Sequence, residues 1–370
     1  MSNRLESLEK ILLMGPGPSM VHSSVYAAMA KDTIGHMDSS FIALMDDIKE
    51  QLRSLCCTKN SVTMPMSGTG SAGMETCFVN LVEPGDAVLV LQNGVFGVRM
   101  ADVAGRLGAD VDVLEFEWGT PVIPDEVAKA LGKKKYALVA VVHAETSTGV
   151  CNPVERIGSL VKEHGALYLV DCVTSLGGIE VALDRWGADA FYSGTQKCLS
   201  CPPGLAPISF SEAAVAKLKN RKKKVPNWYL DLMMIINYWE GNTRAYHHTA
   251  PVNMNYALYQ ALHLILQEGA DKVFARHKAA HDRLVDGLDA LGFKMYVKED
   301  CRLPMLNAVV PPPGVDEAKL RKQLRQEYMI ELGSGLGPLA GKIIRIGLMG
   351  ETARPENVNR LLAALRQCIA

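Results

Sequence analysis

The stretch Ala166-Leu-Tyr-Leu-Val-Asp171 has the pattern of a buried strand that ends in a carboxylate. Its apolar residues are continuous rather than alternating, which is typical of a strand that is covered on both faces in a parallel sheet. Similar runs rich in valine and leucine occur on both sides of it, at residues 87–91, 111–114, 137–142 and 188–192. With residues 167–170, these runs predict the strands of one mainly parallel sheet.

Helical patterns separate these runs, at residues 98–107, 124–131 and 153–164. The last of them has proline near its start and Gly165 just past its end, which are common helix boundaries. Strands that alternate with helices predict right-handed crossovers and an open α/β sheet. Ligands of such sheets bind at the carboxyl ends of the strands.

The pattern changes after about residue 250. Long helices are predicted at 255–267 and 272–291, with a break at Gly269, followed by short strands at 307–310 and 343–346 and a closing helix at 355–369. We therefore predict an extended N-terminal segment (1–20), a large domain (21–255) and a smaller α+β domain (256–370). The glycines and prolines of Leu12-Leu-Met-Gly-Pro-Gly-Pro18 argue against regular structure there, and we expect this stretch to cross the large domain.

Composition and charge narrow the class of protein. The 370 residues are 48% apolar and 21% charged with a net charge of -1, so neither nucleic acid nor a membrane is expected as a partner. The charged N-terminus lacks the apolar core of a signal peptide, and no run approaches the ~20 apolar residues of a membrane helix. Nine cysteines, an odd number, suit reduced thiols and predict a cytoplasmic enzyme. Cys198 and Cys201 have the spacing of a redox pair, but no second pair supports that role.

A lysine follows the Asp171 strand, in the run Ser193-Gly-Thr-Gln-Lys197. Taken singly, the two residues suit a helix cap and a solvent-facing lysine. Together, a carboxylate at a strand end and a lysine on a glycine turn suit pyridoxal 5'-phosphate. That cofactor needs an amine to bond with its aldehyde and an anion to keep its ring nitrogen protonated. We therefore predict Lys197 and Asp171 as catalytic residues.

Two further polar stretches lie where the same ligand would need them. Ser67-Gly-Thr-Gly-Ser-Ala-Gly73 precedes a helical pattern at 74–82 and suits either an anion cup or a structural turn. It is neither a Walker loop nor a dinucleotide fingerprint, and no strong strand is predicted before it. His143-Ala-Glu-Thr-Ser-Thr-Gly149 follows the strand at 137–142. There Thr146 suits a cofactor oxygen, and a capped turn is the simpler interpretation of His143.

In their order along the chain, these motifs resemble the fold-type I, class V pyridoxal-phosphate enzymes. The resemblance is strongest to the alanine–glyoxylate and serine–glyoxylate (serine–pyruvate) aminotransferases and runs almost from end to end. It rests on Met14-Gly-Pro-Gly-Pro-Ser19, Ser67-Gly-Thr-Gly70, Asn93-Gly-Val-Phe-Gly97, His143-Ala-Glu-Thr-Ser-Thr-Gly149, Asp171-Cys-Val-Thr-Ser-Leu-Gly-Gly178, Ser193-Gly-Thr-Gln-Lys197, Pro202-Pro-Gly204, Tyr246-His-His-Thr249, Gly335-Leu-Gly-Pro338 and Arg345-Ile-Gly347.

The resemblance implies a set of cofactor contacts. Lys197 would bond covalently to the cofactor, and Asp171 would pair with its ring nitrogen. Val173 would pack on one ring face and Phe96, where family members often carry tryptophan, on the other. The remaining contacts would be Thr146 to the phenolic oxygen, and Thr69, Gly70, Ser71 and Gln196 to the phosphate. No metal is implied.

The resemblance also implies substrate contacts and a homodimer. Tyr246 and Thr249 would reach the phosphate of the partner subunit's site. Arg345 would bind the substrate carboxylate with its two-pronged fork. Gly17 would let the N-terminal segment pass close to the substrate. His36 would line the pocket, although a structural turn histidine fits it at least as well.

The implied activity is ping-pong transfer of an amino group from a small amino acid, alanine being favoured, to glyoxylate or another small 2-oxo acid. Serine, ureidoglycine or 3-hydroxykynurenine are alternative donors on the same fold. The ureidoglycine branch departs from tyrosine at Tyr246, which argues against it here. A lyase or cysteine desulfurase needs a reactive cysteine on a mobile loop, and Cys301 lacks such a context. Lys197, Asp171 and Arg345 together argue against a non-catalytic protein.

Overall fold

The computed structural model describes residues 3–241 and 243–369 and is built around a seven-stranded sheet. The strand order is β2-β10-β9-β8-β5-β3-β4. The bounds are β2 (Val62–Ser67), β3 (Ala87–Gln92), β4 (Asp110–Glu115), β5 (Leu138–Val142), β8 (Leu167–Asp171), β9 (Ala190–Tyr192) and β10 (Leu205–Phe210). Strands β4, β3, β5, β8 and β9 run parallel, whereas β10 is antiparallel to both of its neighbours. The predicted mainly parallel α/β sheet is confirmed.

Two strands of this sheet escaped the sequence prediction. The expectation that no strong strand precedes the 67–73 loop is wrong, because β2 ends at Ser67. Strand β10 was not predicted either. Each carries a proline in mid-strand, and Pro65 lies opposite Pro207 in the register. Proline has no N–H to donate and reads as a strand breaker, so it masked the apolar pattern of both strands.

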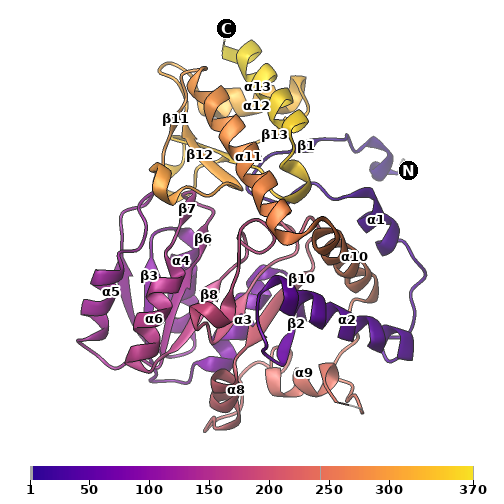
Figure 1. Cartoon of the computed structure of the whole chain (residues 1–370), viewed down its shortest axis with the longest axis vertical. Helices are drawn as coiled ribbons and strands as arrows, with labels where there is room; N and C mark the ends of the chain where they lie inside the picture. The colour runs from indigo at the N-terminus through magenta and orange to yellow at the C-terminus, as the bar shows by residue number, and fades with distance from the viewer. Residues whose placement is uncertain (1–2, 242, 370) are drawn as a thin grey trace.

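The sheet is buried because helices cover both of its faces (Figure 1). Side chains alternate across a strand, so in β3 Leu89 and Leu91 join one core while Val88 and Val90 join the other. The first core is covered by α2 (Ser39–Leu55), α5 (Pro124–Leu131), α6 (Val154–His164) and α10 (Val252–Glu268). The second is covered by α3 (Gly70–Leu81), α4 (Val95–Arg106), α8 (Glu212–Lys219) and α9 (Leu232–Trp239). Continuous apolar runs are therefore what these strands require.

The C-terminal part forms a second sheet, in the order β11-β12-β15-β14. Its strands are β11 (Lys294–Met295), β12 (Leu306–Val310), β14 (Gly333–Ser334) and β15 (Ile344–Gly347), and its helices are α11 (Ala270–Asp289), α12 (Glu317–Glu327) and α13 (Pro355–Ile369). Gly269, at φ +94°, separates α10 from α11 as predicted. The strands and the closing helix predicted here are confirmed, while the exact domain limits remain a prediction.

The N-terminal segment corrects one expectation. Strand β1 (Leu12–Leu13) pairs in parallel with β13 (Ile330–Glu331), and Gly347 N–H donates to the Met14 carbonyl at 2.7 Å. The expectation of irregular structure crossing the large domain is therefore wrong for Leu12–Met14. The reason is that the glycines and prolines begin only at Gly15, so this apolar run keeps its N–H groups and packs into the C-terminal core. Beyond Gly15, the segment lies against the large domain, where Ser19 N–H donates to the Gln196 carbonyl at 2.9 Å.

A membrane-spanning helix would need a long and uniformly apolar stretch. Over residues 3–241 and 243–369, no helix meets both requirements.

Candidate active site

A cavity of about 170 Å³ lies where three parallel strands end. Val142, Asp171 and Tyr192 are the last residues of β5, β8 and β9, and all three line it. Parallel strands place their carboxyl ends at one edge, which is why residues far apart in sequence meet there. The predicted site residues that line this cavity are Gly70, Ser71, Phe96, Thr146, Asp171, Val173, Gln196 and Lys197.

Asp171 is a buried carboxylate held by two hydrogen bonds. Val173 N–H donates to Oδ1 at 2.8 Å, and the Tyr192 hydroxyl donates to Oδ2 at 2.7 Å. Burial raises the pKa of Asp171 to about 7, although these two bonds lower it. An anion this poorly solvated is stabilised by a cationic partner in the cavity.

Lys197 presents its amine to the same cavity. Burial first, and then the nearby charge of Arg345, lower the pKa of Lys197 to about 8. The amine donates a hydrogen bond to the Pro16 carbonyl. Gly17 lies next to it at φ +107°, and a Cβ added there would come within 2.8 Å of Lys197 Nζ. The structure thus places the N-terminal segment against the lysine. Because its pKa is lowered, a fraction of the Lys197 amine is unprotonated and nucleophilic near neutral pH.

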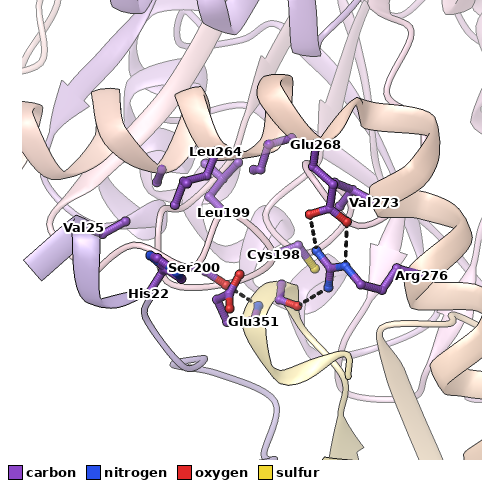
Figure 2. A pocket seen from close by; sticks show the side chains of 13 residues that line it. His22, Val25, Cys198, Leu199, Ser200, Leu264, Glu268, Val273, Arg276 and Glu351 are labelled. Carbon is purple, nitrogen blue, oxygen red and sulfur yellow. Dashed lines mark hydrogen bonds and ion pairs between the residues drawn. The ribbon is translucent and has the colours of Figure 1, made fainter. Parts of the chain in front are cut away.

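The loop that carries Lys197 is held by contacts from outside the large sheet. Ser19 Oγ donates to the Lys197 carbonyl at 2.7 Å, and Ser200 Oγ accepts from Glu351 N–H at 2.8 Å. Figure 2 shows the residues that line a small pocket beside the loop, among them Glu268 and Arg276, which form an ion pair. The volume of this pocket is about 20 Å³. Cys198, Leu199 and Ser200 of the lysine loop also line this pocket, so its other residues pack against the loop.

Cys198 and Cys201 are also part of this loop. Both thiols are buried, and burial raises the pKa of each to about 12. A thiol that is neither exposed nor ionised is a poor redox nucleophile. The two cysteines therefore act as buried packing residues of the loop, and their CxxC spacing indicates no redox role.

A substitution at Gly350 tests the contact between the Gly350 turn and the lysine loop. It sits at φ +53°, and a Cβ added there would lie 1.9 Å from Ser200 Oγ and 2.7 Å from the Cys198 carbonyl. We expect Gly350→Ala to lower the free energy of unfolding by roughly 2–4 kcal/mol, because the turn and the lysine loop cannot keep their separation. Denaturant unfolding measures the change. Gly341→Ala is the matched control, since Gly341 has φ +73° but no atom within 4 Å of the added Cβ. Equal losses for the two variants would contradict the role of the contact.

The start of α3 forms one side of the cavity. Thr69 is the N-cap residue but makes no side-chain capping bond, and Gly70 and Ser71 line the cavity. Gln196 lies beside them, and its Oε1 is buried with no hydrogen-bond partner in the described part of the chain. Free N–H groups at a helix start and a buried amide without a partner indicate a place for an anionic, hydrogen-bonding group.

Glu145 braces the loop that follows β5. It is buried, and it accepts from Ser147 N–H at 3.0 Å, from Ser147 Oγ at 2.6 Å and from Phe96 N–H at 3.3 Å. The last bond ties the start of α4 to this loop. The Phe96 ring is thereby positioned on the cavity wall, with Val173 also lining the cavity.

Arg345, on β15, borders the cavity without being one of its lining residues. Its Nε donates to the Ser334 carbonyl at 2.6 Å, and its Nη1 donates to the Thr146 carbonyl at 3.0 Å. Burial lowers the pKa of Arg345 to about 10, so the guanidinium stays charged at neutral pH. A fixed cation with N–H groups to spare is suited to a carboxylate.

His143 faces away from the cavity. Its ring meets Trp186 edge-on at a centroid distance of 4.7 Å, and burial lowers the pKa of His143 to about 4. It is therefore a neutral, packed side chain, in keeping with the simpler interpretation.

Six predicted residues do not line the cavity: Thr69, Gly17 and Arg345 adjoin residues that do, whereas His36, Tyr246 and Thr249 lie apart from it. Tyr246 is 63% exposed, and its ring lies 5.3 Å from that of His36. The His36 carbonyl accepts from the Tyr238 hydroxyl at 2.9 Å. His36, Tyr238 and Tyr246 form an aromatic cluster with Tyr246 at the surface, Thr249 is exposed, and none of the four lines this chain's own cavity.

The sequence analysis missed six lining residues: Met74, Arg99, Val142, Ala144, Thr174 and Tyr192. For two of these residues, the sequence contained a pattern from which they could have been predicted. Tyr192 ends a predicted strand and lies in register beside Asp171. Arg99 follows Phe96 by three positions on α4, and residues at that spacing share a helix face.

Comparisons with known proteins identify the family. The family model described as aminotransferase class-V matches residues 19–361. The chain is a class V aminotransferase. It is 39% identical to the alanine–glyoxylate aminotransferase of Rattus norvegicus over 98% of this chain and 88% of that protein. It is 38% identical to the (S)-ureidoglycine–glyoxylate transaminase of Bacillus subtilis over 95% of this chain and 89% of that protein.

A solved structure supports the same assignment. The alanine–glyoxylate aminotransferase of Nostoc sp. superposes with a TM-score of 0.96 at 46% identity, covering 100% of both chains. The resemblance inferred from motifs and the predicted fold class are confirmed, and this class V aminotransferase is a transaminase. Transaminases act on amino acids and 2-oxo acids, and the family implies pyridoxal phosphate as cofactor.

Proposed function

We propose that this aminotransferase uses pyridoxal 5'-phosphate to move an amino group from a small amino acid, with alanine favoured, to glyoxylate or another small 2-oxo acid. The observation that carries the proposal is the meeting of the Lys197 amine and the Asp171 carboxylate in one cavity. The names of the relatives, which pair glyoxylate with alanine or ureidoglycine, support the choice of acceptor. The cytoplasmic location stays a prediction from the sequence.

The residues of the cavity fit this cofactor. Its pyridinium nitrogen would satisfy the buried carboxylate of Asp171, whose pKa is raised to about 7 without such a partner. Its flat ring suits the space between Phe96 and Val173, and its phosphate suits the start of α3, where Thr69, Gly70, Ser71 and Gln196 gather. Thr146, buried beside these walls, supplies a hydroxyl for the ring's phenolic oxygen.

When bound, pyridoxal phosphate supplies an electron sink for the carbanion that forms at the substrate α-carbon. Lys197 would hold the cofactor through its amine, and the same amine, when free, would serve as the general base for the proton on the substrate α-carbon. Asp171 holds positive charge on the ring nitrogen. Arg345 fixes the substrate carboxylate and so orients the α-carbon toward Lys197. Gly17 leaves the space in which the amine moves.

The active unit in this proposal is a homodimer. Tyr246 and Thr249 lie outside the chain's own cavity, and Tyr246 is highly exposed for a tyrosine. An exposed aromatic cluster suits burial against a second copy of the chain. Each chain would lend these two residues to the phosphate of its partner's site, and His36 would accompany them.

A donor panel with glyoxylate as the common acceptor tests the proposal. We expect alanine to give a kcat/KM at least about tenfold above those of serine, ureidoglycine and 3-hydroxykynurenine, a difference of about 1.4 kcal/mol in transition-state binding. Conversion of the bound cofactor, followed by absorbance in single turnovers, measures each donor separately. A higher value for serine or ureidoglycine would replace alanine as donor. Failure of every donor with cofactor bound would overturn the proposed function.

A cysteine desulfurase is the alternative from another reaction class. It would need a cysteine that reaches the cavity, whereas Cys301 lies in a separate cluster with Val150 and Val297. Its thiol is buried, which raises its pKa. These observations favour amino transfer over sulfur chemistry.

A further inference from the structure

The cavity has too little positive charge to match the phosphate of the proposed cofactor. Two cations line the cavity in the described part of the chain, Lys197 and Arg99. In the proposed function, on which this inference rests, the amine of Lys197 is consumed by its bond to the cofactor. A phosphate monoester carries about two negative charges near neutral pH. The start of α3 offers it N–H groups and a partial dipole but no full charge.

Arg99 is the cation that remains. It lies on α4, which contacts α3, and it lines the same cavity as Gly70, Ser71 and Met74 of α3. Its guanidinium carbon sits 5.0 Å from the centroid of the Phe96 ring, which holds the side chain over the aromatic face.

No carboxylate satisfies this guanidinium. Among the described residues, Arg99 pairs with no acidic side chain, whereas Arg106, further along the same helix, pairs with Asp102 at 2.8 Å. Arg345, the other cation nearby, already donates to two backbone carbonyls and sits on β15. An arginine kept unpaired at a cavity wall is available to an anion, and its planar fork matches phosphate oxygens.

We propose that Arg99 is a binding residue for the cofactor phosphate, supplying the full positive charge that the α3 cup lacks. Phe96 then has two functions, since it packs on the ring and also holds Arg99 over the cavity. The alternative occupant of Arg99 is a second carboxylate on a dicarboxylic substrate. The phosphate is favoured because Arg99 lies on α4, which contacts the helix α3 that carries the cup, whereas Arg345 lies on β15 and donates to the Thr146 carbonyl.

The test compares pyridoxal phosphate with pyridoxal, which differs only by the phosphate. Dissociation constants are measured on the cofactor-free protein by absorbance and by intrinsic fluorescence, without any substrate. We expect Arg99→Gln to weaken pyridoxal phosphate by about 10- to 100-fold, the range for a hydrogen bond to a charged group, and to leave pyridoxal within about twofold. Arg99→Lys keeps the charge and should recover part of the loss. Arg106→Gln is the matched control on the same helix and should change neither constant.

Each outcome decides the proposal. A loss confined to pyridoxal phosphate supports it, and inorganic phosphate should then compete less well with the cofactor in Arg99→Gln than in the wild type. Equal losses for both compounds overturn it, because Arg99 would then act by positioning the Phe96 ring. Unchanged binding together with slower turnover of aspartate alone also overturns it and assigns Arg99 to a substrate carboxylate. A wild type that binds neither compound refutes the proposed function itself, whereas normal wild-type binding with an unaltered variant refutes only the role of Arg99.

Discussion

Lys197→Ala is expected to lower the transamination rate by roughly 10⁴-fold or more, because the variant loses both the covalent bond to the cofactor and the general base. The structure offers no substitute. In the described part of the chain the other cation lining the cavity is an arginine, Arg99, and a guanidinium carries only donors and cannot accept the proton. Single-turnover kinetics with alanine and glyoxylate measure the loss.

Cofactor retention separates this chemical loss from a loss of folding. Asp171, Phe96 and the α3 cup remain in Lys197→Ala, so the variant should still bind the cofactor, without a borohydride-trapped adduct at position 197. Lys278→Ala is the control, since Lys278 is exposed and pairs with Asp282 on the surface of α11. Turnover at the wild-type rate in Lys197→Ala would overturn the assignment of the lysine.

Asp171→Asn is expected to lower kcat by roughly 10²–10³-fold, the usual cost of removing one fixed electrostatic group from an active site. Asparagine keeps the shape, and its amide can still accept from Val173 N–H and face the Tyr192 hydroxyl. What is lost is the negative charge that would keep the ring nitrogen protonated. Steady-state kinetics and the absorbance of the bound cofactor report the change.

The same variant makes a prediction on stability that needs no cofactor. Since burial raises the folded-state pKa of Asp171 to about 7, the wild type loses stability as pH rises from about 4, the ordinary pKa of Asp, through 7. This loss is absent in Asp171→Asn, which cannot ionise. Denaturant unfolding of the cofactor-free protein between pH 5 and 8 should therefore show a smaller decline for the variant. Parallel declines would mean that Asp171 is not the group that titrates, and a wild-type kcat in Asp171→Asn would remove its catalytic role.

The sequence alone was sufficient to predict those elements whose local residue pattern matches their surroundings in the fold. The Asp171 strand is apolar throughout because both of its faces are buried, and that pattern is visible without coordinates. The break at Gly269 could also be predicted from the sequence, because glycine tolerates the backbone conformation that ends α10. Strands β2 and β10 were hidden because Pro65 and Pro207 interrupt the pattern, and only their pairing shows that both are strands.

The sequence predicted the reactive groups of the cavity but only some of the residues that line it. Lys197 and Asp171 could be found from residue type and position alone. Tyr192, which holds Asp171, and Arg99, which stands over Phe96, needed the register of β8 with β9 and the face of α4. Such contacts join residues through tertiary packing, which a single sequence does not record.

By itself, the sequence indicated the reaction class of this protein, because its motifs, in their order along the chain, resemble those of class V aminotransferases, and the family comparisons confirm that resemblance. The tertiary structure decided how reactive those groups are. Burial is the largest cause that brings the pKa of Asp171 up to about 7 and that of Lys197 down to about 8. That burial arises only when the sheet, the N-terminal segment and the Gly350 turn pack around them. Desolvation depends on everything that surrounds a group, so it cannot be assigned from any one stretch of the chain.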